Sequence, residues 1–390
     1  MIGMRHPFAD SVAIAGASTT GFEARNTDCS QLSYVTDACV RVLRDCGLQA
    51  SDIDGLCGSL PEAPSVQAAL GIPEIQWFAN PAIPFLNQLA AAASAVHSGL
   101  CTVALAYHGS YRQSWNTASA LRDPFRRGPG GSPTGLPPPP ESVHGAPGYT
   151  AWASRYLHEY SVTREQIGLL VLNARTNAMA NPAAAMRSPL TMYDYLNARM
   201  IRWPLCLLDM EMPVDGADAF IITTAERAAD MPRHPVLIHA LSLGMINQCD
   251  EAQTPSLRQH GQQVVVKALR SRCSFWIEDV DVYFPYDGFS IIALNWLENA
   301  GWCGPGEAGL FLDEHWDVDL GRIMIGGKVP INTHGGSLSE GGTQGSGHLR
   351  EAVHQLQWSA GERQVKGAQR ALVTGGGFFF NSQGVMLRRA

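Results

Sequence analysis

The chain has 390 residues, of which 45% are hydrophobic and 16% charged, so it is long enough to bury a sizeable core in two or three domain-sized units. Its formal net charge of -7 gives no overall positive field of the kind that attracts nucleic acid or anionic membranes. Nine cysteines, an odd number without a C-x-x-C pair, fit reduced thiols better than disulfides or zinc ligands. Because no signal peptide or membrane-spanning apolar run is found either, we expect a cytoplasmic protein.

The predicted elements at the start of the chain alternate between strands and helices. Residues 12–18 are expected to form a buried strand, and residues 30–46 a helix whose apolar positions recur at spacings of three and four residues. A helix at residues 86–98 leads through Gly99 to a strand at residues 102–106. This alternation is typical of an α/β protein.

The same order of elements recurs in the second half of the chain and indicates an internal duplication. A strand at residues 235–244 precedes a helix around 255–272 and a strand at 282–284. A helix at residues 349–358 then leads to a strand at 368–374. Continuous apolar strands separated by helices favour mainly parallel sheets covered on both faces, so we expect two similar α/β halves packed together.

The expected boundary divides the chain into an N-terminal half, residues 1–230, and a C-terminal half, residues 231–390. The N-terminal half includes a loop region at residues 110–200. Its first part, residues 110–150, is rich in glycine and proline and is expected to run over the surface. A plain surface loop is the favoured interpretation, but Arg126 is a candidate for binding the phosphates of a nucleotide-like ligand, because guanidinium groups bind phosphate oxygens bidentately.

Short strings from the middle of the chain to its C-terminal end resemble those of sterol-carrier-type thiolases and their lipid-transfer-protein relatives. In chain order they include Asn173-Ala174-Arg175, Asn181-Pro182-Ala183, Asp215-Gly216-Ala217-Asp218-Ala219, Tyr286-Asp287-Gly288-Phe289, Asn332-Thr333-His334-Gly335-Gly336 and Gly375-Gly376-Gly377. Each string alone is weak, but their order and spacing carry the resemblance, which covers nearly the whole chain. It implies an α/β protein with the thiolase-like duplicated five-layer αβαβα fold, assembled as a homodimer, with an acyl-CoA entering between core and loop region.

The catalytic groups of thiolases are replaced at the matching positions. Ala82 stands where the resemblance places the nucleophilic cysteine, at the start of a helix whose N-terminus would favour a thiolate. Val373 stands at the position of the second cysteine, and Gly342 at that of the Gly-His-Pro histidine. Tyr286 replaces the first residue of the Asn-Glu-Ala-Phe motif. A cysteine-thioester mechanism is therefore excluded.

The related lipid-transfer-protein aldolases cleave 3-hydroxyacyl-CoA esters by a retro-aldol reaction, which needs no covalent intermediate. It requires a base for the hydroxyl proton and donors that stabilise the enolate on the thioester oxygen. The resemblance implies Tyr286 as the base, since a phenol whose pKa is lowered by its neighbours can transfer a proton. These aldolases carry a second tyrosine where this chain has Gly342, so His334 and His348 are candidates to replace it. Asp287 would orient Tyr286 or a histidine.

Other positions are candidates for contacting the acyl-CoA. Gly375 and Gly376 let the main chain approach a ligand closely, and with the N-terminus of the helix after Ala82 they would form an oxyanion site. Asn332, in the polar glycine-rich loop, is a further candidate. Structural roles compete with all these assignments: a tight turn for the glycines, a core hydroxyl for Tyr286, a helix cap for His348 and a local backbone acceptor for Asp287.

The leading hypothesis is a carbon–carbon lyase that cleaves a 3-hydroxyacyl-CoA with a bulky, steroid-derived side chain into a ketone or aldehyde and a shortened acyl-CoA. An acyltransferase of the same superfamily is an alternative that Ala82 disfavours, and a non-catalytic acyl-CoA or lipid-binding scaffold is one that Gly342 favours. We expect no metal, since no histidine and carboxylate cluster has metal-ligand spacing, and no cofactor beyond the coenzyme A of the substrate. The resemblance also implies a small OB-fold, zinc-ribbon partner or an associated hydratase.

Overall fold

Nine strands form the large sheet of this computed structural model within the residues that it describes. Those residues are 5–24, 28–112, 114, 146–247, 257–258, 260–377 and 381–390. The strands from the first half are β1 (Val12–Glu23), β2 (Gly55–Gly58), β3 (Trp77–Ala79), β4 (Val103–Tyr111) and β7 (Asp215–Thr224). The strands from the second half are β8 (Val236–Gly244), β9 (Val282–Phe284), β13 (Arg370–Gly375) and β14 (Ser382–Arg389).

The two groups of strands share one topology, which agrees with the duplication expected from the sequence. Their orders are β1-β7-β4-β2 and β8-β14-β13-β9, and β3 extends the first group at its outer edge. In both groups the final strand of the group lies beside the first one. β1 and β8 join the groups through only two residue pairs. The predicted division at residues 230 and 231 falls in the segment before β8 and stays a prediction.

The expectation of mainly parallel sheets is wrong, because the final strand of each group runs against both of its neighbours. β14 follows β13 after the short connection 376–381, and a short connection can join only antiparallel strands. β7 is likewise antiparallel to β1 and to β4. Parallel pairing is limited to the outer strands, where β2 pairs with β3 and β4, and β9 pairs with β13.

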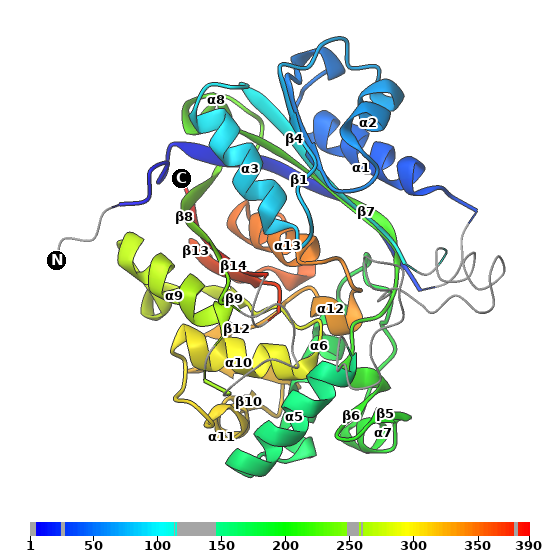
Figure 1. Ribbon diagram of the computed structural model, residues 1–390, viewed down its shortest axis with the longest axis vertical. Helices are drawn as coiled ribbons and strands as arrows, with labels where there is room; N and C mark the ends of the chain where they lie inside the picture. Colours follow the sequence, from blue (N-terminus) through cyan, green and yellow to red (C-terminus); the bar gives the residue numbers. More distant parts are fainter. Residues whose placement is uncertain are drawn as a thin grey trace.

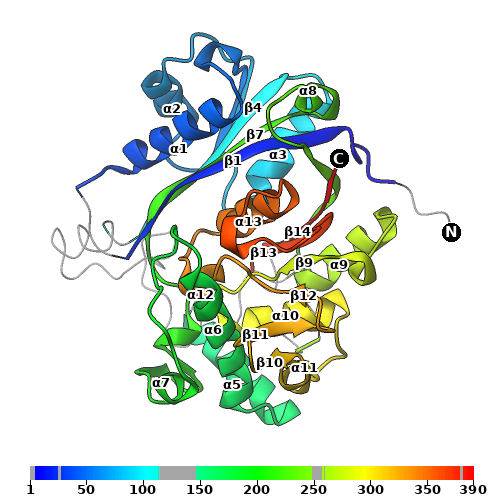
Figure 2. The same ribbon diagram turned by 180° about the vertical axis from the view of Figure 1, so that it is seen from behind.

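Helices occupy three levels around these strands and give the five-layer αβαβα arrangement, which is confirmed (Figure 1). The central level contains α3 (Leu86–His97) and α13 (Ser346–Leu356), which lie between the two groups of strands. α1 (Gln31–Asp45) and α2 (Ala63–Leu70) cover the first group from outside. α9 (Gly261–Arg272) and α10 (Ser290–Ala300) cover the second group, and Figure 2 shows the same order from behind.

The loop region between β4 and β7 contains helices as well as irregular chain. It holds α5 (Ala146–Tyr160), α6 (Arg164–Met179), α7 (Met192–Leu196), β5 (Met200–Arg202) and β6 (Leu205–Cys206). α6 begins at a reciprocal cap, in which Thr163 Oγ1 accepts from Gln166 N at 3.2 Å and Gln166 Oε1 accepts from Thr163 N at 3.0 Å. Arg126 lies outside the described residues, so its predicted phosphate contact stays a prediction.

The remaining elements belong mainly to the second half. They are α8 (Ala225–Ala229), α11 (Ala308–Glu314), β10 (Trp316–Asp317), β11 (Arg322–Ile325), β12 (Val329–Pro330) and α12 (Gly336–Ser339). None of the described helices is long and apolar enough to cross a membrane. The eight cysteines within the described residues are all free, and Cys249 lies outside them.

The central helix α3 combines small residues with a few large apolar ones, and both groups of strands depend on it. Alanines favour the helix and let strands approach it from two sides, while Leu89 is fully buried in the core between them. We expect Leu89→Ala to lower the free energy of unfolding by about 2–5 kcal/mol, because the cavity left behind cannot collapse fully. Leu310, which is 65% exposed, gives the control variant Leu310→Ala. Equal urea midpoints for the two variants would contradict the central position of α3.

Candidate active site

Several of the predicted site residues meet where β9 and β13 end, beside the N-terminal ends of α3 and α13. The carboxyl ends of parallel strands lie at the same edge of a sheet, and crevices form there. Tyr286 follows β9 and Gly376 follows β13, and both line a cavity of about 140 Å³. The other lining residues are Pro84, Tyr149, Glu211, Gly288, Phe289, Ile292, Gln344, Gly377 and Asn381.

Tyr286 is buried in the wall of this cavity, and its hydroxyl donates to Glu211 Oε2 at 3.0 Å. Burial, and then the negative charge of Glu211, raise the pKa of Tyr286 well above its usual value. The sequence-based expectation that neighbours lower this pKa is therefore wrong, because burial disfavours the phenolate and the group that accepts from the hydroxyl is a carboxylate. Tyr286 is a proton donor in the resting site.

Glu211 and Arg112 are the site residues that sequence reasoning missed. Arg112 Nη1 forms an ion pair with Glu211 Oε1, and Gln344 Nε2 donates to the same oxygen at 3.4 Å. Glu211 follows β6 in the loop region and Arg112 follows β4, so no local motif links either of them to Tyr286. The one available signal was Gly342 itself. A glycine in place of the expected second tyrosine indicated that another residue takes its role, but not which one.

Gly342 lies directly against this ion pair. A Cβ at this position would come within 2.5 Å of Arg112 Nη1 and 2.9 Å of the Glu211 carboxyl carbon. The Gly342 amide also donates to Met212 O at 2.8 Å, which fixes the glycine-rich loop to the segment that carries Glu211. The charged pair therefore occupies the space that a side chain at residue 342 would need.

His348 and Asp287 form a buried pair behind Tyr286. His348 Nε2 lies 2.9 Å from Asp287 Oδ1, which also accepts from Ser337 N at 2.7 Å. The His348 and Tyr286 rings are 5.6 Å apart between centroids. α13 begins at Ser346 after the cap residue Gly345, so a capping role for His348 is wrong. Asp287 orients His348, and neither residue lines the cavity.

His334 is fully buried and lies behind His348. The centroids of the two imidazole rings are 4.7 Å apart. Among the described residues neither of its ring nitrogens has a hydrogen-bond partner, and Nε2 lies 3.8 Å from Glu340 Oε2. Burial, followed by His348, lowers the pKa of His334 well below its usual value. Burial also raises the pKa of Glu340 to about 7. His334 thus belongs to a buried polar cluster and does not line the cavity.

The predicted ligand-contacting residues separate into three cases. Asn332 Nδ2 donates to Pro285 O at 2.9 Å, so Asn332 anchors the segment before Tyr286 and does not line the cavity. Ala82 is exposed and lies before Pro84, which reaches the cavity in its place. Gly376 lines the cavity, and its φ of 71° favours glycine, but its contact with the acyl-CoA stays a prediction.

The first amides of α3 are not available for an oxyanion site. Phe85 N donates to Gln344 O at 2.9 Å, and Leu86 N donates to Gln383 Oε1 at 3.0 Å. Gly375 belongs to β13 and pairs with Gln383. The predicted oxyanion site at the start of α3 is therefore wrong, because the protein itself uses these donors.

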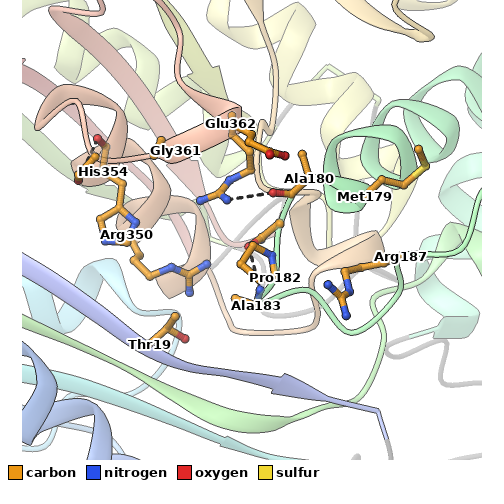
Figure 3. A pocket seen from close by; sticks show the side chains of 14 residues that line it. Thr19, Met179, Ala180, Pro182, Ala183, Arg187, Arg350, His354, Gly361 and Glu362 are labelled. Carbon is orange, nitrogen blue, oxygen red and sulfur yellow. Dashed lines mark hydrogen bonds between the residues drawn. The ribbon is translucent and has the colours of Figure 1, made fainter.

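A larger pocket of about 620 Å³ lies between β1, the end of α6 and α13 (Figure 3). Arg350 lines it but forms ion pairs with Asp218 and Glu340, and Arg363 forms one with Glu351. Most of its positive charge is thus balanced inside the protein. Its lining residues include none of the predicted site residues. Among the described residues no group of histidine, cysteine, aspartate or glutamate could hold a metal ion.

Comparison with known proteins gives relatives over nearly the full length. Residues 242–389 match the thiolase C-terminal domain-like family. The chain is 31% identical to the 17-hydroxy-3-oxo-4-pregnene-20-carboxyl-CoA lyase of Mycobacterium tuberculosis, over 93% of this chain and 96% of the relative. It is 29% identical to the steroid side-chain-cleaving aldolase of Thermomonospora curvata, over 94% of this chain and 95% of the relative.

Solved structures give the same picture. The protein solved as Ltp2-ChsH2(DUF35) aldolase matches with a TM-score of 0.82 and 28% identity, over 98% of both chains. Human mitochondrial 3-ketoacyl-CoA thiolase matches with a TM-score of 0.69 and 15% identity, over 98% of this chain and 99% of that one. The second likeness is one of fold alone.

The buried His334 predicts a specific loss of stability in acid. Below its ordinary pKa of 6.5 the unfolded chain protonates this residue, whereas the folded chain does not, so the free energy of unfolding falls as the pH falls. We expect this contribution to approach about 1.4 kcal/mol per pH unit. Urea unfolding at pH 5.5 and 7.5 should show a smaller difference for His334→Gln than for the unmodified protein. Equal differences would contradict this, and the exposed His97 gives the control variant His97→Gln.

Proposed function

The chain belongs to the thiolase superfamily, in the branch of lipid-transfer-protein-type aldolases, and from this membership we propose that it cleaves a 3-hydroxyacyl-CoA by a retro-aldol reaction. The products are a ketone or aldehyde and a shortened acyl-CoA. The observation that carries the proposal is the hydrogen bond from Tyr286 to Glu211 in a cavity whose lining residues include no cysteine. Such a site can move protons, and the described residues that line it offer no thiol for a covalent intermediate.

The proposed reaction needs proton transfer at one end of the substrate and enolate stabilisation at the other. The 3-hydroxyl proton leaves, the bond between C2 and C3 breaks, and its electron pair enters the enolate of the thioester. A proton then adds to C2. Tyr286 is the phenol on the cavity wall that contacts the hydroxyl and relays its proton. Gln344 and the main chain at Gly376 are the lining groups that we assign to the thioester oxygen.

The proposed substrate is a bulky, steroid-derived acyl-CoA, because one relative is named a steroid side-chain-cleaving aldolase and another a 17-hydroxy-3-oxo-4-pregnene-20-carboxyl-CoA lyase. Tyr149 and Phe289 stack with ring centroids 4.4 Å apart and, with Ile292, give the cavity an apolar wall suited to a carbon skeleton. Coenzyme A enters as part of the substrate. A phosphate contact from Arg126 remains part of the proposal.

The assembly is a further part of the proposal. The solved Ltp2-ChsH2(DUF35) aldolase includes a second protein in its name. We therefore propose that this chain works with a second protein. From the family resemblance we further propose that this partner is a small OB-fold, zinc-ribbon protein and that the chain forms a homodimer in the cytoplasm. An associated hydratase is the alternative partner. The polar contacts of Tyr286 inside the cavity favour an enzyme over a lipid-binding scaffold.

The reaction itself is tested by mass spectrometry of products. The chain, with and without a co-purified OB-fold partner, is mixed with 17-hydroxy-3-oxo-4-pregnene-20-carboxyl-CoA, the ester named for the Mycobacterium tuberculosis relative. We expect a 17-ketone and a shortened acyl-CoA, and no acyl adduct in the intact-protein spectrum. An acid-stable adduct would exclude the non-covalent mechanism. Tight binding without turnover in both samples would favour the scaffold.

Removal of one hydroxyl tests Tyr286. Tyr286→Phe should lower kcat by about 100-fold or more, because the proton relay from the substrate is lost while the ring still fills the wall. The matched control is Tyr156→Phe, which removes a buried hydroxyl that donates to Glu298, outside this cavity. Calorimetric binding of the acyl-CoA should change little in either variant. A similar kcat for both variants would contradict a role of Tyr286 in proton transfer.

A further inference from the structure

We infer that Glu211, held by Arg112 in the space that Gly342 leaves open, is the carboxylate that takes up the 3-hydroxyl proton through Tyr286. This inference rests on the proposed retro-aldol function and assigns its base. It also explains how this chain compensates for the second tyrosine that the related aldolases are expected to carry at residue 342.

Glu211 has the contacts that this role requires. Its Oε2 faces the Tyr286 hydroxyl at 3.0 Å, while its Oε1 is held by Arg112 and Gln344. The carboxylate lines the cavity, and its side chain is 12% exposed, so it is shielded from solvent but reaches the site. The guanidinium fixes the carboxylate against Tyr286, and the Glu211 amide donates to Gly288 O at 2.9 Å, which fixes its main chain.

Glycine at residue 342 is explained by space and not by backbone conformation. Gly341 and Gly345, in the same loop, have φ values of 146° and 88°, which favour glycine. Gly342 itself does not have a positive φ. Any residue could adopt its backbone. The obstacle to a side chain is the Arg112–Glu211 pair. A side chain at residue 342 would therefore displace Arg112 or Glu211 from its present position.

The proton movements balance without any further reactant. Tyr286 takes the 3-hydroxyl proton while its own proton passes to Glu211, so no free phenolate forms. The C2–C3 bond breaks, C3 becomes the carbonyl carbon, and the electron pair enters the enolate. The proton then returns from Glu211 through Tyr286 to C2. Both side chains regain their starting states, and nothing is oxidised or reduced.

A second tyrosine–glutamate pair in the same protein separates this role from ordinary packing. Tyr156 donates to Glu298 between α5 and α10, but no arginine among the described residues forms an ion pair with Glu298, and this pair does not line the cavity. Burial and the neighbouring carboxylate raise the pKa of both tyrosines. The Tyr286–Glu211 pair differs in two ways: both residues line the cavity, and Glu211 forms an ion pair with Arg112.

The test compares Glu211→Gln with the matched variant Glu298→Gln on the same acyl-CoA and partner. We expect Glu211→Gln to lose about 100-fold or more in kcat with little change in KM, whereas Glu298→Gln keeps kcat within about threefold. Circular dichroism confirms that both variants are folded. A Glu211→Gln variant that keeps kcat within about threefold of the unmodified protein would overturn the inference.

Chemical rescue distinguishes a proton-accepting role of Glu211 from a purely structural one, because an added carboxylate can accept a proton but cannot restore packing. Glu211→Ala leaves space beside Arg112 for a small carboxylate, so formate should restore turnover in proportion to its concentration. Formate should not restore Tyr286→Phe, in which the relay itself is missing. Failure of formate to stimulate a folded Glu211→Ala variant would also count against Glu211 as the base. Absence of cleavage by the unmodified chain with its partner would instead overturn the proposed function, and this inference with it.

Discussion

The burial of α3 and α13 between two groups of strands is the constraint on which the rest of the structure depends. Both groups cover their inner faces with the same two helices, so the halves cannot separate without exposing this shared layer. The helices begin at the cavity, where the hydrogen bond from Phe85 N to Gln344 O joins their N-terminal ends. Pro84 and Gln344 line the cavity for this reason. The packing of these two helices therefore also sets the geometry of the cavity.

The positions that the resemblance assigns to the two thiolase cysteines carry no thiol in this chain. Ala82 is exposed, and Val373 is buried within β13, so neither former cysteine position supplies a reactive group. A phenol and a carboxylate face the cavity instead. Cleavage of a carbon–carbon bond next to a hydroxyl needs proton transfer and not acyl transfer, and this pair is suited to it.

A buried polar cluster behind the cavity supports this arrangement. His348 is held by Asp287, His334 lies against Glu340, and Arg350 pairs with Glu340. Buried charges are costly unless they are paired, so the ion pair of Arg350 with Glu340 restricts where the loop around residue 340 can lie. Because that loop carries Gly342, the cluster also fixes the space in which Arg112 and Glu211 meet.

The sequence by itself determined the alternation of elements, the duplication, the loss of both cysteines and the position of Tyr286 in the cavity wall. These features follow from local periodicity and from residues at matching places in ordered motifs. The tertiary structure decided the rest. Only the structure shows that β7 and β14 run antiparallel to their neighbours, and only folding brought Glu211, 75 residues before Tyr286, to its hydroxyl. The direction of the Tyr286 pKa likewise depends on burial and on that carboxylate, which no local pattern encodes.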